Sequence, residues 1–162
     1  MLTLQNYLRL FFDMIKRVIL CISLFFVALV SWSQSPIKWS ASFKMIDEVN
    51  GVVTFKASIA NGLHLYGIDI PAGGPVPTSF NFNNSQGIDF VDSPIPSVKP
   101  IVAYDDVFGL ELNWWEREVS FKQKFIVKND KEAIIDCVVK YMACDNKSCL
   151  PPRKEHIQLK VK

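Results

Sequence analysis

From residue 34 onward, the sequence alternates between apolar and polar positions over most of its length. Apolar side chains occupy nearly every second position in five stretches, residues 39–45, 53–59, 119–127, 135–141 and 157–161. Successive side chains of a β-strand point to opposite faces, so this period is typical of strands with one buried and one solvated face. No stretch has the spacing of a convincing amphipathic helix. The pattern therefore predicts strands almost throughout.

Turn-forming residues separate the alternating stretches. They include Asn50-Gly51, Asn61-Gly62, Asn83-Asn84 and, near the end, Leu150-Pro151-Pro152. Asn and Gly accept left-handed backbone conformations, and Pro cannot donate to a sheet ladder. We count eight or nine short strands joined in this way. Short strands with regular turns predict an all-β protein, an antiparallel β-sandwich of the immunoglobulin-like type.

The first 33 residues have a different character. Met14-Ile-Lys-Arg precedes a mostly apolar run, residues 18–32, and small side chains occupy positions 31 and 33, the two that a signal peptidase recognises. The run is shorter than the roughly 20 residues that span a bilayer, which favours a cleaved leader over an anchor. We predict a signal peptide at 1–33, with Met14 as an alternative start, cleaved before Gln34. Residues 34–162 would then be one exported domain in a compartment where disulfides persist.

Charge changes the picture only slightly. The chain has 18 basic and 16 acidic residues, and residues 1–33 hold three of the former and one of the latter, which leaves 15 of each in the mature domain. A neutral domain lacks the basic surface that nucleic acids and anionic membranes attract. With three cysteines and two histidines after residue 33, none at zinc-finger spacing, we expect neither a metal site nor a cofactor.

The cysteines of the mature chain differ in their surroundings. Cys137 alternates in phase with apolar neighbours, which predicts a free, buried thiol on an inward strand face. If the strand is continuous, Cys144 lies about 23 Å further on, too far for a disulfide with Cys137. Cys144 and Cys149 flank a four-residue turn and can close easily. On spacing alone, a structural disulfide and a redox-active one are equally good interpretations.

Three stretches resemble one known family. Residues 141–152, Tyr-Met-Ala-Cys-Asp-Asn-Lys-Ser-Cys-Leu-Pro-Pro, resemble the cysteine motif of the N-terminal periplasmic domain of the thiol:disulfide interchange protein DsbD, the disulfide bond corrector domain family. Residues 62–66 and the following 73–78 resemble that family's tyrosine segment, and residues 104–109 resemble its cap loop. The stretches occur in the family's order, and the resemblance covers residues 39–161.

The resemblance implies roles for individual residues. Cys149 would form the mixed disulfide with a partner, and Cys144 would resolve it. Tyr66 would line the sulfur pocket. The remaining implied positions are in the cap loop: Asp105 and Asp106 as its acids, and Phe108 as the aromatic shield of the disulfide, with Val107 as the alternative if the register shifts by one residue.

The resemblance also implies an activity. The domain would be a periplasmic protein-disulfide reductase that relays electrons from a thioredoxin-like donor to disulfide-bearing protein partners. Because the sequence ends at Lys162, we expect a stand-alone, monomeric domain whose donor and acceptor are separate proteins, with the membrane reached only through the donor. The alternative is a non-catalytic secreted β-sandwich that binds a protein partner and keeps Cys144–Cys149 as a structural disulfide.

The acids near the cysteines bear on how the thiols would react. Asp145, Asp105 and Asp106 would disfavour a nearby thiolate, and Lys147 is the one cation of the loop between the cysteines. We therefore expect thiols of ordinary or raised pKa that react mainly after a partner has docked.

Overall fold

The alternating stretches form strands in the computed structural model, which describes residues 9, 11–19, 35–128, 132–145 and 147–162. Eleven strands lie among these residues, two or three more than the turn signals indicated. They are β1 (Ile37–Met45), β2 (Asn50–Ile59), β3 (His64–Tyr66), β4 (Ser79–Asn81), β5 (Ile88–Pro96), β6 (Ile101–Asp105), β7 (Leu110–Glu116), β8 (Glu118–Val127), β9 (Ile134–Tyr141), β10 (Ala143–Cys144) and β11 (Arg153–Lys160). β3, β4 and β10 have at most three residues, too few to show a period of two.

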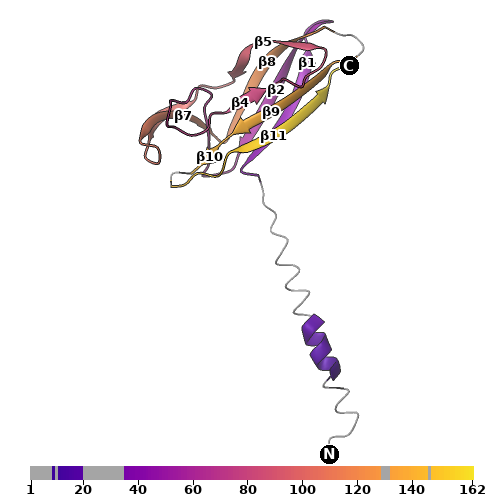
Figure 1. Ribbon diagram of the computed structural model, residues 1–162, viewed down its shortest axis with the longest axis vertical. Helices are drawn as coiled ribbons and strands as arrows, with labels where there is room; N and C mark the ends of the chain where they lie inside the picture. The colour runs from indigo at the N-terminus through magenta and orange to yellow at the C-terminus, as the bar shows by residue number, and fades with distance from the viewer. Residues whose placement is uncertain (1–8, 10, 20–34, 129–131, 146) are drawn as a thin grey trace, which may run out of the picture. The chain divides into compact units, whose positions relative to one another are not determined.

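The strands form three sheets in which every pairing is antiparallel. One sheet has the order β1-β2-β8-β5, the second β10-β3-β7-β6, and the third β11-β9-β4. Figure 1 shows β7 and β10 at one end of the domain, away from the C-terminus. The all-β antiparallel sandwich expected from the alternation is confirmed.

The main core lies between the inner faces of β2, β8 and β9. Its fully or almost fully buried members include Val53, Phe55, Ala57, Val119, Phe121, Phe125, Ile135, Cys137 and Val139. Phe55 and Phe121 face each other across the β2–β8 ladder, and the ring of Phe121 also packs against Trp115 and Trp39. Burial of these apolar side chains is the dominant stabilising term of the fold.

The sheet β10-β3-β7-β6 uses its two faces differently. Leu65, Trp115 and Ala143 point into the main core, whereas Tyr66, Leu112 and Cys144 belong to a second apolar cluster on the opposite face. Leu65 pairs with both Trp115 and Ala143 in the ladders, so a single layer of residues faces the core. Because neighbouring residues of a strand point in opposite directions, this sheet can contribute to two separate clusters.

The unit Met1–Gln34 is described by itself and only in part. Residues 11–19 are helical. Among the described residues, no helix has both the length and the apolar character needed to cross a membrane. The expected cleavage position before Gln34 lies outside the residues described, as do most of the expected apolar leader residues, so the signal peptide stays a prediction.

Candidate functional site

Cys144 and Cys149 form a disulfide at the tip of a short hairpin. Cys144 is the last residue of β10 and is fully buried, and Cys149 is partly exposed. Their Cα atoms are 4.1 Å apart, and the Leu150 amide donates to the Ala143 carbonyl at 3.0 Å. The hairpin therefore presents one buried and one partly exposed cysteine.

The carboxylate of Asp145 holds the turn between the two cysteines. Its Oδ1 atom accepts hydrogen bonds from the amides of Lys147 at 2.8 Å and Ser148 at 2.7 Å. These bonds, with that of Lys147 first, lower the pKa of Asp145 below its ordinary value. A fixed negative charge thus lies directly beside Cys144, which supports the expectation that the thiolate form is disfavoured there.

The cap loop connects β6 to β7 and is organised by Asp105. Oδ1 of this buried carboxylate accepts from the amides of Val107 at 2.9 Å and Phe108 at 3.1 Å. The Gly109 amide donates to the Asp105 carbonyl at 2.8 Å, and Gly109 has a φ of 66°, a left-handed conformation that glycine adopts without strain. One aspartate therefore shapes the whole turn.

Tyr66 joins the cap loop to β3. Its hydroxyl donates to Oδ2 of Asp105 at 2.6 Å, in a fully buried position. Desolvation, followed by this hydrogen bond, raises the pKa of Tyr66 far above its ordinary value. The phenol therefore stays neutral and acts as a donor that fastens the loop.

The sulfur pair lies within the second apolar cluster. Besides Tyr66, Leu112 and Cys144, partly buried Phe108, Trp114, Met142 and Cys149 pack into it. The ring of Phe108 meets Tyr66 edge-on, with centroids 5.8 Å apart, whereas 44% of Val107 is exposed. Of the two shield candidates, Phe108 is the one in the cluster.

The implied site residues thus fall into two groups. Tyr66, Asp105, Phe108, Cys144 and Cys149 are brought together by β3, β10 and the cap loop. Asp106 and Val107 belong to the same loop but face solvent. Both line a cavity of about 280 Å³ that also touches Asp145 and Trp114, next to the disulfide hairpin.

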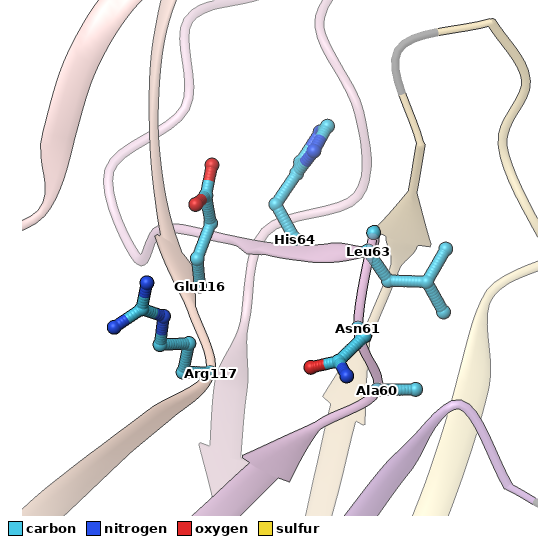
Figure 2. Close-up of a pocket in the computed structure, with 7 residues that line it drawn as sticks. Ala60, Asn61, Leu63, His64, Glu116 and Arg117 are labelled. Carbon is cyan, nitrogen blue, oxygen red and sulfur yellow. The ribbon is translucent and has the colours of Figure 1, made fainter.

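His64 is a residue of this site that the sequence argument did not assign to it. It lies directly opposite Cys144 in the β3–β10 ladder and lines two cavities. One is the cavity beside the cap loop, and the other, of about 270 Å³, is lined by the β2–β3 turn and the junction of β7 and β8 (Figure 2). Only 5% of His64 is exposed, and its Nε2 atom has no hydrogen-bond partner among the described residues. Burial lowers the pKa of its imidazole, so the ring is neutral at neutral pH.

An available signal would have assigned His64 to the site. Residues 64 and 66 share a strand face because they are two apart, so a histidine at 64 must lie on the same side as the implied pocket tyrosine. The ladder pairing with Cys144 itself is a tertiary contact across 80 residues of sequence, and no local pattern predicts it.

Cys137 has no place in the site. It is a free thiol on β9, fully buried in the main core, as its phase in the alternation predicted. Desolvation raises the pKa of the thiol to about 12. A thiol so buried and so weakly acidic is unreactive at neutral pH.

No group of three or more metal-binding side chains lies together among the described residues. The site brings together two sulfurs in a disulfide, a carboxylate–phenol pair, an imidazole and apolar rings. A disulfide in such a place can undergo thiol–disulfide exchange.

Comparisons with known proteins agree with this chemistry. A family model described as "Thiol:disulfide interchange protein DsbD, N-terminal" matches residues 34–161. No curated protein matches the sequence significantly.

Two solved structures match this chain. The N-terminal periplasmic domain of ScsB from Proteus mirabilis matches with a TM-score of 0.58 and 16% identity, over 82% of this chain and 49% of that one. This chain therefore spans about half the length of that relative. The reduced n-terminal domain of DsbD from Neisseria meningitidis matches with a TM-score of 0.46 and 16% identity, over 77% of this chain and 85% of that one. The immunoglobulin-like class expected from the sequence is confirmed.

Proposed function

Because this chain belongs to the family of N-terminal domains of the thiol:disulfide interchange protein DsbD, we propose that it exchanges dithiol for disulfide with other proteins through Cys144 and Cys149. Family membership and the disulfide together indicate a general role in thiol–disulfide interchange. The finer proposal is an electron relay, a protein-disulfide reductase that takes electrons from a thioredoxin-like donor and passes them to disulfide-bearing proteins.

One observation carries the proposal: the disulfide closes a short loop at an accessible hairpin and joins no distant strands. Chain-entropy arithmetic for a six-residue loop gives about 2 kcal/mol, against nearly 5 kcal/mol for a loop of a hundred residues. The main core lies elsewhere and contains neither cysteine of the bridge. A bridge of low structural value in a partly exposed hairpin is better suited to exchange than to stabilisation.

The unequal exposure of the sulfurs supports different roles for them. We assign the attack on a partner to Cys149, which is partly exposed, and the resolving step to Cys144, which is fully buried. The Cys149 thiolate attacks one sulfur of the partner disulfide, forms a mixed disulfide and releases the other partner sulfur as a thiolate. The Cys144 thiolate then attacks Cys149 and releases the second partner sulfur. Two electrons pass to the partner, and the domain regains its disulfide.

The cap loop would control access to this chemistry. Phe108 packs in the sulfur cluster, and the Tyr66–Asp105 hydrogen bond holds the loop that carries it. A partner would have to displace the loop before reaching Cys149. This arrangement would limit reaction with unsuitable oxidants, and Asp106 and Val107 would form the outer surface that a partner meets first.

We further propose that the domain acts in the periplasm after removal of residues 1–33. The sequence pattern of the leader and the family's location support this compartment, in which disulfides persist. N-terminal sequencing of the secreted protein tests the cut: the first residue should be Gln34.

Trapping tests the exchange. In Cys144→Ser the resolving thiol is absent, so mixed disulfides through Cys149 should accumulate in periplasmic extract as bands that vanish on reduction. The matched control is Cys144→Ser/Cys149→Ser, which retains Cys137 and should trap nothing. Equal trapping by both variants, or none by either, would contradict the assignment of Cys149.

The reduction potential separates the proposal from the structural alternative. An exchanging disulfide should equilibrate with a thioredoxin-like protein, whose reduction potential is about −270 mV. Structural disulfides typically have reduction potentials below about −300 mV. A bridge that stays closed in equilibrium with a reduced thioredoxin-like donor would favour the non-catalytic binding module.

A further inference from the structure

His64 and Cys144 are cross-strand neighbours in the sulfur site. They are paired residue against residue in the antiparallel β3–β10 ladder. Side chains in such a pair project from the same face, with Cβ atoms about 4.5–5.5 Å apart. An imidazole at this position is within reach of the sulfur it faces.

Two aromatic rings fix the orientation of the imidazole. Trp114 packs against it with centroids 5.0 Å apart and an interplanar angle of 35°, and Tyr66 meets it edge-on at 4.9 Å. Both rings are members of the cluster that contains the disulfide. The imidazole therefore packs against two rings of the cluster that contains the disulfide.

The Nε2 atom of His64 lacks what buried polar atoms normally have. It is inaccessible to solvent and has no hydrogen-bond partner among the described residues. A disulfide sulfur has no proton to donate, whereas a thiol has one. Reduction of the disulfide would thus give Cys144 an S–H group that can donate a hydrogen bond to the unpaired Nε2 atom of His64.

The charged and titratable groups around His64 come from each element packed against it. Glu116 pairs with it on β7 and, in Figure 2, extends to the same side as the imidazole, while Arg117 points away. Asp105 in the cap loop and Asp145 in the hairpin, like Glu116, raise the pKa of the imidazole, but desolvation outweighs them and the net direction is downward. Tyr66 stays neutral. The ring is therefore uncharged at neutral pH and able to take a proton, and the three acids favour the imidazolium once it forms.

We propose that His64 is the proton acceptor for the Cys144 thiol in the resolving step. The inference deepens the proposed function and rests on it. In the mixed disulfide, the Cys144 thiol gives its proton to Nε2 of His64, and the thiolate attacks the sulfur of Cys149. The Cys144–Cys149 bond forms, the bond between Cys149 and the partner breaks, and the electron pair leaves on the partner sulfur. The imidazolium then returns its proton to the partner thiolate or to water.

A thiolate titration tests the pair without any partner protein. In Cys149→Ser the hairpin keeps only Cys144, and its ionisation is followed by thiolate absorbance between pH 5 and 10. Cys137, with its pKa of about 12, stays protonated in this range. Adding His64→Phe, which keeps a ring against Trp114 but removes both nitrogens, should raise the pKa of Cys144 by about one unit or more. His156→Gln, at the exposed second histidine, is the matched control and should leave it unchanged.

A kinetic measurement locates the effect in the resolving step. The reduced domain with its native hairpin reacts with an aromatic disulfide reagent in two phases, attack by Cys149 and then by Cys144. If the pKa of Cys144 rises by about one unit in His64→Phe, the variant has about tenfold less Cys144 thiolate at pH 7. Each thiolate is more nucleophilic, so the second phase should slow by only about threefold, and the first phase should not change. His64→Gln, an acceptor that is not a base, gives the same slowing and serves if the Phe variant does not fold.

The outcomes separate the two proposals. Equal Cys144 pKa values and equal second phases with and without His64 would overturn the role of the imidazole and leave the exchange function intact. A His64-dependent titration in a domain that fails to exchange with any thioredoxin-like protein would uphold the imidazole–thiol pair and reject the proposed function.

Discussion

Two fully buried cysteines, Cys137 and Cys144, show how differently this fold treats a sulfur atom. Cys137 lies in the main core, in the middle of the long β9–β11 ladder and opposite Ile157. Cys144 lies in the second cluster, on a two-residue strand that ends at the hairpin. Neither side chain is exposed, so burial alone does not distinguish the two positions.

The surroundings of the two cysteines differ. The main core consists mostly of apolar side chains, and desolvation there raises the pKa of the Cys137 thiol. The second cluster is bordered by a phenol, a carboxylate and an imidazole within two strands and one loop. Apolar packing dominates the main core, whereas polar side chains gather beside the disulfide, and the two faces of β3 separate these environments.

The largest difference between the regions should appear in stability. Phe121→Ala removes a fully buried ring from the main core and should cost about 3–5 kcal/mol in the free energy of unfolding. Phe108→Ala, in the partly open second cluster, should cost much less but should speed the reaction of the disulfide with a small thiol, because the shield is gone. Urea unfolding and the reduction rate measure the two effects. Similar stability losses would break the distinction between the clusters.

Tyr66→Phe should have an intermediate effect on stability and a specific one on the site. It removes the hydrogen bond to the buried Asp105 carboxylate and should lower the free energy of unfolding by about 2 kcal/mol, leaving the amides of Val107 and Phe108 bound to the carboxylate. With the loop held less firmly, alkylation of the reduced Cys149 should become faster. An unchanged alkylation rate would show that this bond does not hold the cap closed.

Acid should weaken the domain through His64 before it affects the carboxylates. Burial lowers the pKa of the folded-state imidazole below 6.5, so just below that pH the unfolded chain binds a proton that the folded chain does not. Stability should be full above pH 6.5 and should fall as the pH drops from there to the folded-state pKa. The lowered pKa of Asp145 acts separately, below pH 3.8.

Urea unfolding at pH 7 and pH 5 measures the effect of the imidazole. His64→Phe should reduce the loss of stability between these two values, and the exposed His156→Gln serves as the control. If the loss persists unchanged in His64→Phe, the imidazole is not the group responsible.

The smallest effect is expected at Cys137. Cys137→Val replaces a buried free thiol with an apolar side chain of similar size and should change the free energy of unfolding by less than about 1.5 kcal/mol. Exchange through the hairpin should not change at all, as followed by the two-phase kinetics. Slower exchange in this variant would mean that the main core and the sulfur site are coupled.

The sequence anticipated much of this molecule where the signal was local. The alternation in residues 53–59 and 135–141 predicted β2 and β9 and the inward face that carries Cys137. The spacing of Cys144 and Cys149 predicted a disulfide that closes easily, and it is formed. The strands β3, β4 and β10 are too short for a period to be counted, and long-range pairing holds them in place.

What the sequence alone determined, then, is the alternation that makes a sandwich, the family motif and a short cysteine loop, since each depends on neighbours within a few residues. The tertiary structure alone decided that Asp105 binds the hydroxyl of Tyr66 across 39 residues, and that Phe108 rather than Val107 packs in the sulfur cluster. It also decided that His64 faces Cys144. These contacts follow from strand pairing and the turn of the cap loop, and such long-range geometry leaves no periodic trace in the chain.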